Sequence, residues 1–153
     1  MNKLLLIAAL AVAAYFALVP DSPTPDRHES AAHPGVAVVA GDGNNAVLEN
    51  AFANRISNQQ VEGQGTVVKT LPDDNDGSRH QRFIVQLNSG RTLLVSHNID
   101  LAKRIDALRT GDTVAFYGEY EWNPKGGVIH WTHHDPQGRH LAGWIKHDRQ
   151  TYQ

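Results

Sequence analysis

The feature that most constrains the fold is a series of short β-type segments separated by turn residues. Residues 80–87 alternate between apolar and polar side chains, which is the period of a strand with one buried face. An acidic turn rich in Pro, Asp and Gly precedes this segment, and Asn-Ser-Gly follows it. The same reasoning predicts five strands, at 63–71, 80–87, 91–97, 113–122 and 128–134.

A helix is predicted between the third and fourth strands. Asn98 is a suitable cap, and Leu101, Ile105 and Leu108 follow at helical spacing. Three strands, a helix and two strands is the order of the OB fold. The predicted fold class is therefore mainly β, an OB-like five-stranded Greek-key barrel with one helix between strands 3 and 4, plus an N-terminal helix.

Strand alternation also predicts the core. One residue set occupies the apolar side of the strands and should be mutually buried. Its members are Phe83, Val85, Leu93, Val95, Val114, Phe116 and Ile129. The leading helix, at 44–58, should present Val47, Leu48, Phe52 and Ile56 at helical spacing.

The N-terminal third has a different organisation. Residues 1–19 comprise a short start with one lysine and then sixteen apolar residues, so they predict a signal peptide or an N-terminal membrane anchor. Residues 20–43 are rich in Pro, Ser, Ala, Gly and Asp and predict a flexible stalk. The OB-like domain then occupies 59–153. We expect an exported protein, either periplasmic or anchored to the inner membrane and facing the periplasm.

Composition excludes several function classes. Fourteen Lys and Arg against sixteen Asp and Glu give a formal charge of -2, so any nucleic-acid binding would depend on a local patch. The chain has no cysteine, which excludes a disulfide framework, a thiolate metal site and a lipoprotein anchor.

A local basic patch is predicted on the second strand. OB barrels usually bind ligands across strands two and three, which here would display Arg79, His80 and Arg82, with Lys125 in the loop after strand four. Cationic side chains on a solvated sheet could hold phosphate or carboxylate groups of an anionic polymer or a small anionic ligand. The alternative is a solvated polar face without a ligand.

Histidines are concentrated at 130–140. His130 and His134 would lie ~13 Å apart on an ideal strand, too far for one zinc ion. The candidate catalytic residues are His97, His130, His134 and Asp135, and His133 and His140 are candidate ligand-binding residues. The cofactor is left unknown, although a divalent metal could be held if His97, His140 or Asp135 joined a neighbouring pair. The alternative is that the histidines hydrogen-bond to buried carbonyls.

Glu119 and Glu121 share the outer face of the fourth strand. The plain interpretation is that they are solvated, although a carboxylate in a groove could orient an imidazole.

Three blocks of sequence carry a resemblance: residues 78–84, residues 96–102, which include His-Asn-Ile-Asp-Leu-Ala, and residues 130–144, which begin His-Trp-Thr-His-His-Asp-Pro. With these blocks the chain resembles a family of small exported bacterial proteins of unknown function. The resemblance covers roughly 61–147 and implies no activity.

These observations leave three functions open. The first is a binding domain whose histidine-rich polar site engages an anionic, phosphate-bearing polymer such as nucleic acid. The second is a histidine-based phosphodiesterase or nuclease, in which one neutral and one charged imidazole do acid and base work. The third is an envelope metal-binding protein. A membrane would be a partner only through an uncleaved N-terminal segment, and the oligomeric state is unknown.

Overall fold

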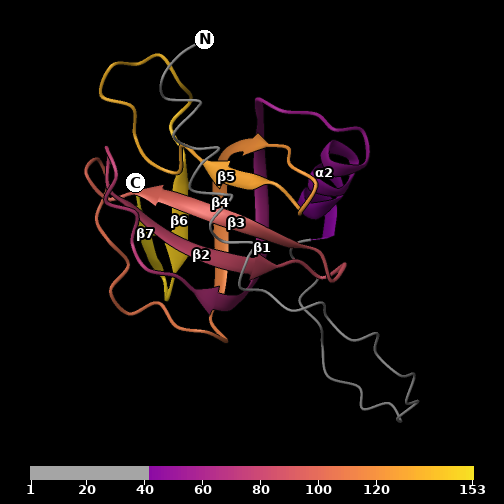
Figure 1. The fold of residues 1–153 in the computed structure, drawn as a ribbon, viewed down its shortest axis with the longest axis horizontal. Coiled ribbons are helices and arrows are strands. Elements are labelled where there is room, and N and C mark those ends of the chain that lie inside the picture. Colours follow the sequence, from indigo (N-terminus) through magenta and orange to yellow (C-terminus); the bar gives the residue numbers. More distant parts are fainter. Residues whose placement is uncertain (1–41) are drawn as a thin grey trace. The chain divides into compact units, whose positions relative to one another are not determined.

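The computed structural model describes residues 42–153 (Figure 1). The signal or anchor predicted at 1–19 and the stalk predicted at 20–43 lie outside these residues, except that α2 begins at Asp42. The elements are α2 (Asp42–Ala53), β1 (Gln59–Thr70), β2 (His80–Gln86), β3 (Thr92–Asn98), β4 (Thr113–Glu121), β5 (Val128–His130), β6 (Trp144–His147) and β7 (Gln150–Tyr152). Within 42–153, no helix combines the length and hydropathy that a membrane crossing requires.

Five of the strands close into a barrel, which confirms the predicted fold class. The strands pair in the order β1-β2-β3-β5-β4, and β4 pairs in turn with β1. β3 and β5 run parallel, whereas the other pairs in the barrel are antiparallel. This is the strand order of an OB barrel.

The long strand β1 closes the barrel because it pairs with two neighbours. Its first part, Gln59–Thr66, pairs with β4, and Thr66–Thr70 pairs with β2. Gly63 lies against the ring of Phe116, so a Cβ at this position would collide with that ring. Glycine therefore allows β1 to pass close to the filled interior.

The predicted core is confirmed. All seven residues expected on the apolar side of the strands belong to one buried cluster. Leu48 and Ala51 of α2 complete this cluster at the side of the barrel where Figure 1 shows the helix. The side chain of Asn45 exchanges two hydrogen bonds with the backbone of Gln64, at 3.1 and 3.2 Å, which fixes α2 to β1.

The predicted apolar face of the leading helix needs correction. Leu48 is buried, but Val47 is 41% exposed and Ile56 is 37% exposed. The helix ends at Ala53 because the chain turns at Arg55, where φ is 54°, and Ile56 therefore lies beyond the helix.

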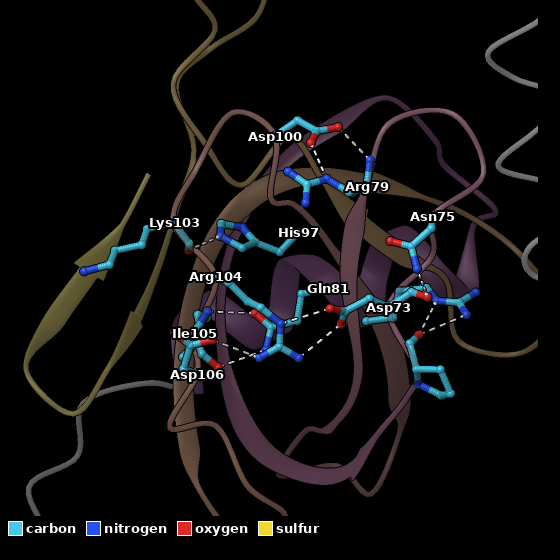
Figure 2. Close-up of polar contacts among 12 residues, drawn as sticks. Asp73, Asn75, Arg79, Gln81, His97, Asp100, Lys103, Arg104, Ile105 and Asp106 are labelled. Carbon is cyan, nitrogen blue, oxygen red and sulfur yellow. Dashed lines mark hydrogen bonds and ion pairs between the residues drawn. The ribbon is translucent and has the colours of Figure 1, made fainter.

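The predicted helix between strands 3 and 4 does not form, and residues 99–112 run as turns. Core side chains take the backbone groups that a helix would use internally. The amide of Gln81 bonds both the N–H and the C=O of Ile105, at 2.8 and 3.0 Å, and the ring of His97 reaches the carbonyl of Lys103 (Figure 2). Ile105 is nevertheless fully buried and belongs to the core cluster, so the segment packs on the barrel without helical geometry.

The predicted fifth strand is also interrupted. β5 ends at His130, because Trp131 adopts a left-handed conformation with φ of 53°. The chain leaves the barrel there and returns as β6, which pairs with the part of β4 that precedes the β5 pairing. Residues 131–143, here called the excursion, thus form a long insertion along one strand edge.

Packing predicts a clear test of this core. Changing Phe116, which is fully buried, to Ala should lower the free energy of unfolding by about 3–5 kcal/mol, because a large ring is lost from a filled interior. Denaturant titration followed by circular dichroism measures this change. The control is Val68→Ala on the same barrel, where the side chain is 37% exposed and the loss should be much smaller. Equal losses in the two variants would contradict the assigned core.

Candidate functional site

The excursion is held in shape by one carboxylate. Asp135 accepts hydrogen bonds from the backbone N–H groups of Gln137 (2.9 Å), Arg139 (2.7 Å) and His140 (3.0 Å). These hydrogen bonds, Gln137 first, outweigh burial and lower the pKa of Asp135. Asp135, predicted as a catalytic residue, is thus placed as an anchor of the loop.

The anchored loop places His140 over the barrel. Its ring stacks on the indole of Trp131, with centroids 3.7 Å apart and planes inclined by 14°. Its Nδ1 lies 3.7 Å from Oε2 of Glu119. The excursion therefore returns an imidazole to the outer face of β4.

The central group of the site is a carboxylate–histidine cluster, formed by Glu119, Glu121 and His130. Glu119 and Glu121 alternate with the buried Tyr120 on β4, so both lie on the outer face. Strand pairing sets His130 of β5 directly opposite Glu119. One potential ligand atom from each of the three residues lies within 4.8 Å of the other two.

His130 has a buried ring nitrogen that makes no hydrogen bond to the described residues. Within the described part of the chain, its Nε2 is inaccessible to solvent and has no hydrogen-bond partner, and it lies 3.5 Å from Oε1 of Glu119. Burial lowers the pKa of His130 to about 4, and the charges of neighbouring imidazoles act in the same direction. The ring is therefore neutral near pH 7 and can offer a lone pair.

Glu119 shows the opposite electrostatic problem. Burial raises its pKa, and the charge of Glu121 adds to this effect, while His140 opposes it. Two carboxylates and a neutral imidazole share one small site, so a cation placed among them would relieve the repulsion.

His97 lies near the excursion but is satisfied. Its side chain is fully buried, Nε2 lies 3.2 Å from the carbonyl of Lys103, and Nδ1 lies 2.8 Å from Oγ1 of Thr132. These partners assign the proton to Nε2 and make the Thr132 hydroxyl the donor to Nδ1. Burial lowers the pKa of His97 to about 4. This geometry favours a structural role over the predicted catalytic one.

The other two excursion histidines do not join the cluster. His133 is buried, its Nδ1 contacts the carbonyl of His134 at 2.8 Å, and its ring lies beside Trp131. Burial lowers the pKa of His133. His134 is exposed, and the continuous strand expected to carry both His130 and His134 is replaced by the turn at Trp131.

The predicted anion-binding face lies on β2, β3 and the residues that precede them, and its arginines already have carboxylate partners. The pairs are Arg79 with Asp100 (2.7 Å), Arg82 with Asp74 (3.7 Å) and Arg91 with Glu49 (2.9 Å). A further pair, Arg104 with Asp73 (2.9 Å), joins the turn segment after β3 to the loop before β2. Figure 2 shows two of them, Arg79 with Asp100 and Arg104 with Asp73. An anionic ligand on this face would have to displace these partners.

The remaining predicted residues have local contacts of their own. Nδ1 of His80 contacts the carbonyl of Ser78 at 2.7 Å. The charge of His80 adds to the effect of burial on the pKa of His130, although His80 is not among the three residues whose ligand atoms converge. Lys125 is exposed in the turn between β4 and β5, where its backbone N–H donates to Asn123.

From the sequence, Glu119 and Glu121 are expected to be solvated or, in a groove, to orient an imidazole, and in the structure both belong to the cluster. Alternation along the fourth strand placed both on its outer face, and the structure agrees. The missing information was the register that sets His130 opposite Glu119. A one-residue change of register would have moved His130 to the other face.

Fold and site together define a small OB-like barrel domain with a carboxylate–histidine cluster on its outer face. The chain belongs to the DUF3465 family, described as proteins of unknown function, whose family model matches residues 33–153. A comparison with curated proteins finds no match.

Buried His97 predicts a specific acid sensitivity. The pKa in the folded state, about 4, lies below the ordinary value of 6.5, so the unfolded chain takes up the proton first. Stability is then lost as pH falls from 6.5 towards 4, by up to about 3 kcal/mol at 1.36 kcal/mol per pKa unit. Denaturant titrations at several pH values, in chelator, should show a weaker pH dependence in His97→Gln. Exposed His134→Gln is the control and should follow the wild type, and identical slopes in all three proteins would contradict the assignment.

Proposed function

We propose that this domain binds a divalent transition-metal ion at the carboxylate–histidine cluster. The observation that carries the proposal is the convergence of ligand atoms of Glu119, Glu121 and His130 within 4.8 Å, with the Nε2 of His130 inaccessible to solvent and without a hydrogen-bond partner within residues 42–153. A cation would satisfy this nitrogen and neutralise the neighbouring carboxylates at the same time.

The donor set indicates the class of metal. One imidazole nitrogen and two carboxylate oxygens suit zinc and related transition metals, whereas calcium and magnesium prefer sites built of oxygen alone. Three protein ligands also leave at least one coordination position for water or a ligand.

We extend the proposal to the anionic ligand expected from the sequence. Arg79, Arg82 and Arg91 are occupied by Asp or Glu, so a bound ion would supply positive charge that does not depend on these arginines. A phosphate oxygen could then take the open coordination position. Hydrolysis of a phosphodiester by metal-bound water is the second candidate, supported by His140, which lies next to Glu119 and is about a third exposed.

An extracytoplasmic location is part of the same proposal. It is supported by the apolar segment after Lys3 and by the absence of cysteine from the sequence. A site that uses only His and Glu does not depend on keeping thiols reduced.

The metal site predicts the effect of one isosteric change. Glu119→Gln should weaken zinc binding at least about tenfold, because an ionised ligand is replaced by a neutral amide. Competition against a chromophoric chelator measures the affinity. The matched control is Glu62→Gln, which removes one charge from an exposed position on β1, and it should bind zinc like the wild type. Equal zinc affinity of both variants would rule out this site.

Anion binding should depend on the metal and not on the arginine face. A fluorescent single-stranded oligonucleotide should bind the zinc-loaded domain, be released by chelator, and bind Arg79→Ala/Arg82→Ala unchanged. If the oligonucleotide still binds in chelator but does not bind the double variant, the anion site lies at Arg79 and Arg82 and does not use the metal. Cleavage of the oligonucleotide in the same samples, lost in Glu119→Gln, would establish the hydrolytic candidate.

A further inference from the structure

Glu119 stands between two imidazoles. Its Oε1 lies 3.5 Å from Nε2 of His130, and its Oε2 lies 3.7 Å from Nδ1 of His140. Oε1 therefore lies on the side of His130, a member of the carboxylate–histidine cluster. The other oxygen is directed to the excursion. The two oxygens of one carboxylate thus have separate partners.

His140 is held firmly enough to act as such a partner. Its ring is stacked on Trp131, and its backbone N–H is bound by Asp135. A movement of about 0.8 Å would bring Nδ1 into hydrogen-bond distance of Oε2. Side chains that hydrogen-bond to a metal ligand orient it and tune its affinity for the metal.

We infer that His140 is a specificity-determining residue of the metal site, and that Asp135 positions it; the inference rests on the metal site proposed above. Nδ1 of His140 faces Oε2 of Glu119 at 3.7 Å, and a hydrogen bond formed there would leave Oε1 as the oxygen that the carboxylate presents to the ion. One-oxygen coordination suits a four-coordinate zinc ion. Calcium needs six to eight oxygens and often takes both oxygens of a carboxylate, so this arrangement disfavours it.

Asp135 binds backbone N–H groups of the excursion and is not among the three residues whose ligand atoms converge. Its carboxylate gathers the N–H groups of Gln137, Arg139 and His140, which sets the turn that carries the imidazole. Loss of this anchor would release His140 from Glu119 while leaving the cluster in place. Asp135 and His140 should therefore act as one unit.

The experiment measures zinc and calcium affinities of the full chain and its variants. His140→Ala should weaken zinc binding about 10–100-fold, the usual effect of removing a partner of a metal ligand. The calcium affinity should not fall with it, because Oε2 of Glu119 becomes available to the ion. The ratio of zinc affinity to calcium affinity should therefore decrease. His140→Asn puts an amide nitrogen near the place of Nδ1 and should restore part of the ratio. His134→Ala removes an exposed imidazole from the same excursion and is the matched control.

A double-mutant cycle tests the role of Asp135. If Asp135 acts through His140, the loss of zinc affinity in Asp135→Asn/His140→Ala should equal that of His140→Ala alone. Fully additive losses would overturn the positioning role. Thermal unfolding in chelator shows whether each variant is folded, and His140→Asn serves if the alanine variant is not.

The outcomes separate this inference from the proposed function. An unchanged zinc-to-calcium ratio in His140→Ala, with wild-type zinc binding intact, would overturn the inference and leave the metal site standing. Absence of zinc binding in the wild type would overturn both. The inference would be established by three results together. The zinc-to-calcium affinity ratio decreases in His140→Ala, recovers in part in His140→Asn, and keeps its wild-type value in His134→Ala.

Discussion

Closure of the barrel by β1 is the constraint on which the rest of the structure depends. β1 bonds β4 along one stretch and β2 along the next, and it passes so close to the core that Gly63 cannot carry a side chain. With one edge of β4 taken by β1, the other edge is divided between β5 and β6. The chain must leave the barrel between these two short strands. The excursion, and with it the placement of His140, follows from that division.

The charged side chains near β2 and β3 have different partners from those on β4 and β5. On β2 and β3, arginines meet carboxylates drawn from the neighbouring loops and from α2. On β4 and β5, Glu119 and Glu121 face imidazoles, whose charge depends on protonation. Burial lowers the pKa of both His97 and His130 to about 4, but the hydrogen bonding of the two rings differs. Both ring nitrogens of His97 have hydrogen-bond partners, whereas Nε2 of His130 has no hydrogen-bond partner in the described residues and lies 3.5 Å from Oε1 of Glu119.

Sequence patterns predicted the barrel because strand alternation is a local property. Val114 and Phe116 face inward simply because they lie two residues apart on one strand. The apolar residues after Asn98 have helical spacing, but the expected helix does not form. The backbone N–H and C=O of Ile105 bond instead to the side chain of Gln81, which lies 24 residues away in sequence. The carboxylate–histidine cluster was not predicted from the sequence, because Glu119 and His130 are brought together by the pairing of β4 with β5. Non-local hydrogen bonds decided both cases.

The interruption of one strand edge also bears on how such a domain can change over evolutionary time. Trp131 and Gly143 lie side by side at the base of the excursion, so close that a Cβ on Gly143 would strike the carbonyl of Trp131. The barrel register on either side is set by β5 and β6 and does not depend on the length of chain between them. Insertions or deletions there could reshape the chemistry above β4 while the scaffold stays intact. The strand pairs on either side of the excursion would then hold the scaffold while the segment between them changes.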